Sequence, residues 1–284
     1  MEFDKELFRK KLIDTFASFD HFCKVHDIKY FAAYGTLLGA VRHKGLIPWD
    51  DDIDVYMIRE DYDKFCSFRG KVGAHYDIMT IEDENYWLLS LAKYVDVSTT
   101  IQEVEYYPLI LGVYIDVFPL DEVPSQDSLG LKKEYDKCSF LVARGMMRHS
   151  FSQILKSFSS PRSFLFKLCN ILYHNRRLSV YMKQYLSCVD KIKNQKGDYY
   201  VSYDGPYGAG EIMKKSYFMD AIELDFEGMK ISASPEYDSI LTQLYGDYMT
   251  PPPPEKQVSH HNHFFIDLNE RISMDQIKRI MHER

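Results

Sequence analysis

Four acidic side chains lie within five residues of one another, at Asp50, Asp51, Asp52 and Asp54. Carboxylate oxygens are the ligands that Mg²⁺ and Mn²⁺ prefer. The alternation of acidic and apolar residues from Asp52 to Val55 predicts a strand with two carboxylates on one face and two side chains in the core. Repulsion among the carboxylates is typical of a cation site or of perturbed pKa values. We therefore expect Mg²⁺ or Mn²⁺ on Asp52 and Asp54, with Asp50 and Asp51 either completing the coordination through water or bracing the turn.

An acidic surface turn would carry the same charges, but the spacing of the carboxylates argues against it. An EF-hand loop beginning at Asp50 requires Gly at its sixth position and Glu at its twelfth. The chain has Val55 and Asp61 there. Calcium buffering is therefore not expected.

A glycine turn precedes the acidic segment, at Gly35 and Thr36. Glycine lets the backbone turn sharply, and the Thr36 side chain can cap the apolar helical run from 37 to 41. Free backbone amides at a helix start favour an anionic phosphate. The sequence therefore predicts phosphate binding at Gly35 and Thr36.

A further carboxylate follows in the third of three runs that are rich in β-branched and aromatic residues, namely 76–81, 87–95 and 111–118. Such runs predict strands that extend one sheet. In the last run Tyr114, Asp116 and Phe118 share one face, so Asp116 can lie beside Asp52 and Asp54 if the strands are neighbours. An aspartate that only ends a strand is the alternative.

The stretch GTLLGAVRHKGLIPWDDDID, residues 35–54, resembles the signature of the LicD family. That family includes bacterial phosphocholine transferases and the catalytic domains of fukutin and fukutin-related protein. Further matches follow in order at 116–121, 226–228 and 245–249, with prolines and His260 beyond. The resemblance spans most of the chain, with a gap between about 125 and 200. It implies a mixed α/β fold of the α+β class: a nucleotidyltransferase-like mixed β-sheet flanked by helices, with a basic helical insertion.

The resemblance also implies roles for individual side chains. Asp116 would be a third metal ligand, or the catalytic base that takes the proton of the acceptor hydroxyl. Lys93 resembles a basic position near the donor phosphates, although a strand lysine that is simply exposed is the alternative. Arg42 would stabilise the leaving group together with Lys93, and His260 would reach the donor. His261 and His263 lie close to His260, but no Cys or evenly spaced partner supports a metal site there, and a solvent-exposed tail is the other interpretation.

The expected reaction is Mg-dependent transfer of phosphocholine from CDP-choline to a hydroxyl of a surface glycan, with release of CMP. The glycan or lipid-linked glycan would be a capsule, teichoic acid or lipopolysaccharide precursor. Ribitol-phosphate or glycerol-phosphate transfer from the CDP-linked donor is the first alternative. A true nucleotidyltransferase and a non-catalytic subunit of a glycan-assembly complex are the others. No nucleic acid partner is expected.

Composition agrees with this interpretation. The chain has 284 residues, 45% of them hydrophobic, and a net charge of −7, and its longest apolar runs are interrupted and too short to cross a bilayer. The charged start, MEFDKELFRKK, does not resemble a signal peptide. Five cysteines without CxxC or Cys/His spacing favour reduced thiols and no structural zinc. We therefore expect a cytoplasmic protein, with peripheral contact at the inner membrane face.

Charge is segregated along the chain. The segment 144–196 holds eleven Lys or Arg and one Asp, a charge of +10, which leaves −17 on the remainder. Its apolar residues predict two or three amphipathic helices, broken at Pro161 and near Asn175. These helices either rest on an anionic membrane or hold a polyanionic acceptor, or they cover the acidic body of the same protein.

We divide the chain into a catalytic core at 1–124, a basic helical insertion at 125–200 and a C-terminal part of the catalytic domain at 201–284. Other patterns predict the elements that position the site: helices at 4–26, 59–68, 235–244 and 274–282, and a hairpin at 218–231.

Overall fold

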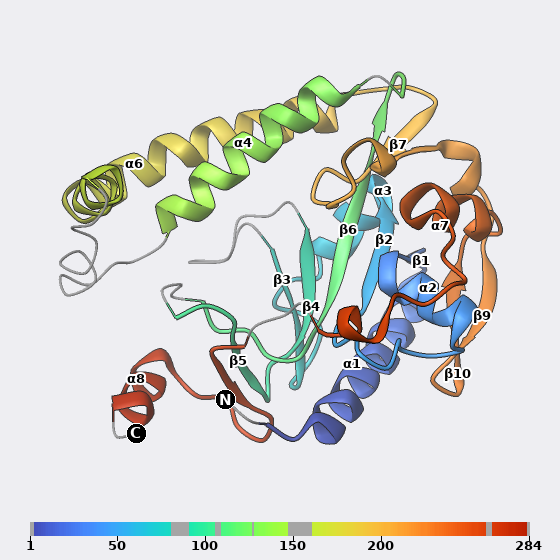
Figure 1. Ribbon diagram of the computed structural model, residues 1–284, viewed down its shortest axis with the longest axis horizontal. Helices are drawn as coiled ribbons and strands as arrows, with labels where there is room; N and C mark the ends of the chain where they lie inside the picture. The colour runs from blue at the N-terminus through green and yellow to red at the C-terminus, as the bar shows by residue number, and fades with distance from the viewer. Residues whose placement is uncertain are drawn as a thin grey trace.

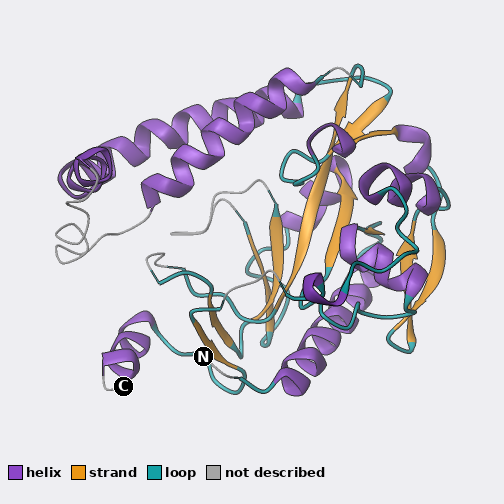
Figure 2. Ribbon diagram, viewed as in Figure 1, coloured by secondary structure: helices purple, strands orange, loops and turns teal. Residues whose placement is uncertain are grey.

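The computed structural model describes residues 3–80, 91–105, 109–126, 128–146, 161–259 and 263–282, and within them it shows a mixed sheet flanked by helices (Figures 1 and 2). The main sheet has seven strands in the order β1-β2-β6-β4-β3, with β7 paired to β6 and β8 paired to β7. The strands of this sheet are β1 Phe31–Ala32, β2 Asp54–Ile58, β3 Tyr76–Met79, β4 Ala92–Asp96, β6 Tyr114–Val123, β7 Tyr199–Val201 and β8 Ile212–Lys214. The pairing of β2 with β6 is parallel and the other pairings are antiparallel.

Two small antiparallel ribbons complete the β structure. They join β9 (Ile222–Phe226) to β10 (Met229–Ala233), and β5 (Thr100–Gln102) to β11 (Phe265–Asp267). The turn of the first ribbon contains Glu227 and Gly228, both at positive φ. The predicted hairpin is therefore confirmed.

The helices are α1 Lys5–Val25, α2 Tyr34–Arg42, α3 Arg59–Cys66, α4 Leu129–Met146, α6 Pro161–Lys193, α7 Tyr237–Tyr245 and α8 Met274–His282, with short 3₁₀ turns at Gly208–Glu211, Lys215–Phe218 and Pro254–Lys256. Asp4 caps α1 by accepting a hydrogen bond from the Leu7 amide at 2.9 Å. The apolar positions of α1 recur every three or four residues and are buried against the sheet. The helices predicted near residues 4–26, 59–68, 235–244 and 274–282 are confirmed.

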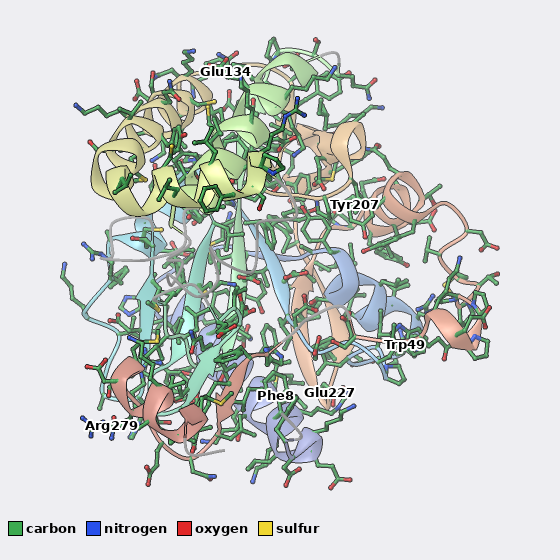
Figure 3. All side chains as sticks on the ribbon, turned by 60° about the vertical axis from the view of Figure 1, so that its left-hand side comes forward. Phe8, Trp49, Glu134, Tyr207, Glu227 and Arg279 are labelled. Atoms are coloured by element: carbon green, nitrogen blue, oxygen red, sulfur yellow. The ribbon has the colours of Figure 1, made fainter. Side chains whose placement is uncertain are left out.

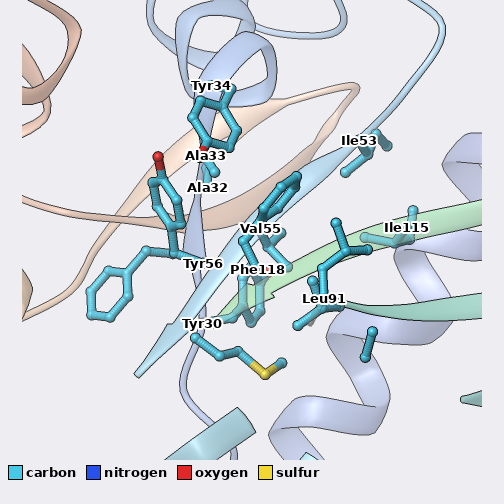
Figure 4. Close-up of a cluster of buried hydrophobic side chains, with 14 of the residues drawn as sticks. Tyr30, Ala32, Ala33, Tyr34, Ile53, Val55, Tyr56, Leu91, Ile115 and Phe118 are labelled. Carbon is cyan, nitrogen blue, oxygen red and sulfur yellow. The ribbon is translucent and has the colours of Figure 1, made fainter. Parts of the chain in front are cut away.

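The centre of the core lies where β2 meets β6 (Figure 4). The Tyr34 ring packs on Tyr56 and Phe118 at centroid distances of 5.0 and 5.1 Å. Val55 and Tyr56, which follow each other on β2, are both fully buried. A strand that has neighbours on both sides and helices on its faces buries both sets of side chains. The prediction of a strand that begins at Asp52, with only one face in the core, is therefore wrong in two respects: the strand begins at Asp54 and both of its faces are buried.

Within the described residues, the insertion holds the helices α4 and α6, which pack along each other (Figure 1). The Lys191 ammonium lies 2.8 Å from Glu134, and the hydroxyls of Tyr135 and Tyr185 are 3.1 Å apart in the interface. Pro161 begins α6, as predicted, because proline fits the first turn of a helix. The break predicted near Asn175 is wrong, since α6 continues to Lys193. Among the helices within the described ranges, none is both long and apolar enough to cross a membrane.

Candidate active site

Two carboxylates meet at the centre of the main sheet. β2 and β6 run parallel in a register that places Asp54 opposite Asp116. The strands are neighbours, as the sequence interpretation required. On the other side of β6, the antiparallel strand β4 places Lys93 opposite Asp116. Three adjacent strands therefore bring two acids and one base to a single point.

Lys93 is buried at this point, with 5% of its surface exposed, so the alternative of an exposed strand lysine is wrong. Its ammonium lies 2.5 Å from Oδ1 of Asp116 and 3.6 Å from the centroid of the Tyr114 ring. A buried ammonium needs a nearby negative charge or an aromatic face to offset its lost hydration, and Lys93 has both. The ion pair holds Asp116 in a fixed position on β6.

Burial raises the pKa of Asp54 well above its usual range, and the charges of Asp52, Asp116 and Asp50 raise it further. The charge of Lys93 opposes this rise but is the smallest of the contributions. Negative charge at this point therefore exceeds the positive charge that the nearby protein groups supply. Bound cations or protons are the usual compensation for such a cluster.

The loop before β2 carries the other acidic residues. A Cβ atom at Gly35 would collide with the carboxylate of Asp50, so glycine leaves room for this carboxylate beside the start of α2. Asp51 accepts a hydrogen bond of 2.6 Å from the Ser259 hydroxyl, which ties the loop to the C-terminal part of the chain. Asp52 is separated from Asp54 by Ile53, and among the neighbouring charges it contributes most to the raised pKa of Asp54.

The capping role predicted for Thr36 is wrong. The helix begins at Tyr34, its N-cap is Ala33, and no side chain caps it. Thr36 lies inside the first turn, where its hydroxyl accepts a hydrogen bond from the Asp54 amide at 2.8 Å. The Ala33 amide donates to the Asp54 carbonyl at 3.0 Å. These two bonds attach the start of α2 to the first residue of β2, so the helix start lies beside the carboxylates. Phosphate binding there stays a prediction.

The chemistry of these side chains fits Mg²⁺, because all the donors are carboxylate oxygens. Within the described residues, no three His, Cys, Asp or Glu side chains form a group that could hold a metal ion. Mg²⁺ is commonly bound by one or two carboxylates together with substrate phosphates, rather than by a complete protein cage. Asp52 and Asp54, with Asp116 beside them, therefore suit a metal that arrives with a phosphorylated donor.

Two other predicted site residues do not join this cluster within the described part of the structure. Arg42 ends α2, at the opposite end of the helix from Gly35, and donates a hydrogen bond of 2.7 Å to the Tyr248 carbonyl. Burial lowers the pKa of Arg42. His260 lies outside the described residues. The leaving-group role of Arg42 and the donor role of His260 stay predictions.

The motif residues beyond Asp116 have structural contacts. Asp121 is buried and accepts two hydrogen bonds from Arg59, at 2.7 and 2.6 Å, which join β6 to the start of α3. Glu227 accepts a hydrogen bond of 2.8 Å from the Leu46 amide and forms an ion pair of 2.5 Å with Arg9. The hairpin turn at Glu227 thus fixes the chain that leads into the acidic loop.

Sequence reasoning missed one buried acid near the site. Glu211 is fully buried and accepts hydrogen bonds of 2.8 Å from the Tyr34 hydroxyl and 2.9 Å from the Tyr207 amide. Burial raises the pKa of Glu211 to about 7. A Cβ atom at Gly205 would collide with this carboxylate. The glycine-rich loop around 205–210 was the sequence signal, because close backbone approach to a buried group requires glycine.

Glu211 accepts hydrogen bonds from Tyr34 and Tyr207, which belong to a group of three tyrosines. The sequence alone did not place Tyr207 relative to the phosphate. The Tyr34 and Tyr207 rings stack at 5.8 Å, and the Tyr245 ring meets Tyr207 edge-on at 5.2 Å. Burial raises the pKa of Tyr207, and the charges of Asp54 and Asp50 add to the rise. The tyrosines therefore form an aromatic wall within electrostatic reach of the carboxylates. Tyr207, which is labelled in Figure 3, is 36% exposed.

Comparison with known proteins agrees with this geometry. Residues 27–183 match the family model described as LicD/FKTN/FKRP, nucleotidyltransferase domain. The match includes α4 and most of α6, where the motifs alone showed no resemblance. The chain is 32% identical over 249 residues to the lipopolysaccharide cholinephosphotransferase LicD of Haemophilus influenzae, which covers 86% of this chain and 90% of that protein. Two uncharacterized proteins, of Rickettsia prowazekii and Rickettsia typhi, are each 58% identical over 36 residues, or 13% of this chain and 14% and 12% of their own lengths.

Proposed function

The chain belongs to the LicD family, and on that premise we propose that it transfers phosphocholine from CDP-choline to a hydroxyl of a surface glycan and releases CMP. The observation that carries the proposal is the register of the three central strands, which brings Asp54, Asp116 and Lys93 together. The relative from Haemophilus influenzae is named a lipopolysaccharide cholinephosphotransferase, which supports the phosphocholine group and a glycan acceptor.

The proposed chemistry is an in-line displacement at the phosphorus distal to cytidine. A new P–O bond forms to the acceptor oxygen, the P–O bond to CMP breaks, and the acceptor proton passes to the Asp116 carboxylate. The Lys93 ammonium holds the Asp116 carboxylate in position, and its charge opposes the negative charge that develops on the departing CMP. The start of α2 orients the diphosphate through the amides at Gly35 and Thr36.

We propose that Asp52 and Asp54 hold Mg²⁺, or Mn²⁺ in its place, with Asp116 or the Asp50–Asp51 loop completing the ligand set. When bound, the ion supplies Lewis-acid charge neutralisation to the phosphate oxygens. Without it, the excess negative charge around Asp54 would repel a diphosphate. The acidic cluster itself therefore supports a divalent cation in the reaction.

The tyrosine wall supports choline as the transferred alcohol. A quaternary ammonium is attracted to the faces of aromatic rings, whereas ribitol or glycerol would need hydrogen-bonding groups aimed at each hydroxyl. Tyr207 offers a partly exposed ring, and Tyr34 and Tyr245 hold that ring in place. We propose that the choline group lies against Tyr207.

Donor selectivity tests this assignment. CMP release would be compared for CDP-choline, CDP-ribitol and CDP-glycerol, in the parent protein and in Tyr207→Phe and Tyr207→Ala. We expect preference for CDP-choline, retained in Tyr207→Phe and reduced about tenfold in Tyr207→Ala, since one cation–π contact contributes about 1–2 kcal/mol when desolvated. Equal use of the three donors, or a Tyr207→Ala variant with parental selectivity, would contradict the choline assignment and favour another alcohol phosphate.

We further propose that the helical insertion makes peripheral contact with an anionic membrane, at the inner face where glycan precursors are assembled. The segment 144–196 carries a charge of +10. α6 also exposes large apolar side chains, at Leu165, Leu172, Val180 and Leu186. Basic and apolar groups exposed on one helix are the combination that binds an anionic interface.

A further inference from the structure

A cavity of about 690 Å³ lies beside the acidic loop. The start of α1, the Pro48-Trp49 corner and the segment near Ser259 enclose it, and Asp50 and Asp51 form part of its lining. The volume is that of a small-molecule site, and the lining mixes aromatic and aliphatic side chains with polar and charged ones. Figure 3 shows Phe8 and Trp49, two of its aromatic walls, on the same part of the molecule.

One polar side chain in this cavity lacks the partners that a buried group requires. The His263 side chain is 7% exposed, and neither ring nitrogen has a hydrogen-bond partner among the described residues. Its nearest carboxylate oxygen, on Asp51, is 3.8 Å from Nε2, which is too long for a hydrogen bond. The rings of Phe3 and Phe8 lie 5.8 and 5.6 Å away. An unpaired buried polar group is destabilising, and a ligand that forms hydrogen bonds with it recovers that free energy.

The lining selects a neutral ligand that is rich in hydroxyls. A hydroxyl donates one hydrogen bond and accepts others, so it can pair with either nitrogen of His263 and with the carboxylates of Asp50 and Asp51. Three acidic residues of the lining, Glu6, Asp50 and Asp51, face two basic ones, Lys5 and Arg9. The Arg9 guanidinium is already paired with Glu227 at 2.5 Å, so the remaining charge of the lining is negative and disfavours a diphosphate. The Trp49 ring adds an apolar face on which the carbon-bound hydrogens of a sugar ring can pack.

From this juxtaposition we propose that the cavity between α1, Trp49 and His263 is the acceptor site and binds a sugar ring of the glycan. The inference rests on the proposed function and adds the acceptor's location to it. Asp50 lines the cavity, and its carboxylate also lies against Gly35 at the start of α2. A sugar hydroxyl beside Asp50 would therefore lie next to the helix start at which we propose that the donor phosphate binds.

The chain offers a direct reporter of this cavity, because Trp49 is one of only two tryptophans. In Trp87→Phe, all tryptophan fluorescence comes from Trp49. This variant would be titrated with methyl β-glucopyranoside, methyl β-galactopyranoside and N-acetylglucosamine at millimolar concentrations, and separately with CMP. We expect a saturable change with at least one saccharide and none with CMP. No saturable change with any saccharide, or a change with CMP alone, would overturn the acceptor assignment.

Substitutions of His263 in the Trp87→Phe background separate binding from a structural role. Loss of one hydrogen bond predicts saccharide binding about tenfold weaker in His263→Phe, with recovery in His263→Gln, which keeps a donor and an acceptor. His21→Phe, an exposed histidine of α1, is the matched control. Equal binding by His263→Phe and the control would refute the role of His263, provided that thermal unfolding shows both variants folded.

Kinetics distinguish failure of this inference from failure of the proposed function. With an acceptor glycan, His263→Phe should raise the KM for the acceptor about tenfold and leave the KM for CDP-choline within about twofold. An equal rise in both KM values would overturn the assignment of the cavity to the acceptor. If the parent protein released no CMP from any CDP-linked donor, the proposed function would fail, while the fluorescence titration would still decide whether the cavity binds a sugar.

Discussion

Replacing Glu211 with glutamine should remove a pH dependence that the structure predicts. Glu211 is fully buried, and its pKa is raised from 4.5 to about 7. Because the folded carboxyl holds its proton more tightly than the unfolded one, its contribution to stability is complete below pH 4.5 and is lost as the pH rises to about 7. Between pH 5 and pH 8 the linkage relation gives a loss of about 2.5 kcal/mol from this group.

The variant Glu211→Gln stays neutral throughout this range. The glutamine carbonyl can accept from the Tyr207 amide and its NH₂ can donate to the Tyr34 oxygen, so both contacts have a substitute. Free energies of unfolding would be measured in urea at pH 5 and pH 8 for parent and variant. We expect the difference between variant and parent to move by about 2.5 kcal/mol in favour of the variant at pH 8.

Taking the difference between the two proteins cancels the pH dependence of every group that they share. Glu255→Gln, at an exposed position, is the matched control and should show no such movement. A Glu211→Gln difference that changed by less than about 0.5 kcal/mol between the two pH values would refute the argument that this carboxyl is buried and weakly compensated.

Three other substitutions test separate parts of the fold and the site. Arg59→Met should lower the free energy of unfolding by about 3–5 kcal/mol, since it leaves Asp121 buried without its partner. Gly35→Ala should slow CMP release at least about tenfold, because the new Cβ displaces the acidic loop from the start of α2. Replacing Arg176 and Arg177 together with Glu should weaken binding to anionic vesicles about tenfold or more, since each basic residue contributes about 1 kcal/mol near such a surface.

Each of these variants has a matched control. Asp63→Asn removes only the exposed partner of Arg59 and should change stability by less than about 0.5 kcal/mol. Gly130→Ala adds a Cβ that meets no atom within 4 Å, and it should leave CMP release unaffected. Charge reversal at Lys278 and Arg279 of α8 should spare vesicle binding. Parental behaviour of a test variant, or equal effects in a test variant and its control, would contradict the corresponding argument.

The sequence predicted those parts of the site that depend on local patterns. Period-two alternation identified the strands that carry Asp54 and Asp116, and it placed the two carboxylates together on the condition that the strands are neighbours, which the structure confirms. The hairpin at Glu227 and the helix that ends at Gly246 also followed from local signals, because glycine marks the turn and the helix end.

Features set by distant contacts could not be predicted in this way. Thr36 has the residue type of an N-cap, but the hydrogen bond to Asp54 uses its hydroxyl inside the helix. Glu211 meets Tyr34 across 177 positions of sequence, and His263 meets Phe3 and Phe8 from the other end of the chain. No periodicity links residues so far apart, so the tyrosine wall and the acceptor cavity required the three-dimensional structure.

The division of the chain into a catalytic core at 1–124, a helical insertion at 125–200 and a C-terminal part at 201–284 stays a prediction. β7, which contains residue 200, and β8, which follows it, extend the sheet that holds the carboxylates. Lys132 of α4 donates a hydrogen bond of 2.8 Å to the Tyr203 carbonyl, so the insertion is anchored on the loop before the tyrosine wall. The helical insertion is thus connected to the active site by this hydrogen bond and by the strands that share the main sheet.

The most direct test of the central claim is CMP release from CDP-choline by Asp54→Asn and Asp116→Asn, measured with Mg²⁺ and again with EDTA. Asparagine keeps the size of each side chain and removes the charge, so the variants should stay folded, as thermal unfolding would show, while their turnover falls by at least about 100-fold. EDTA should abolish turnover by the parent protein. Near-parental rates in either variant, or parental turnover in EDTA, would contradict the proposal of metal-assisted transfer at the paired carboxylates.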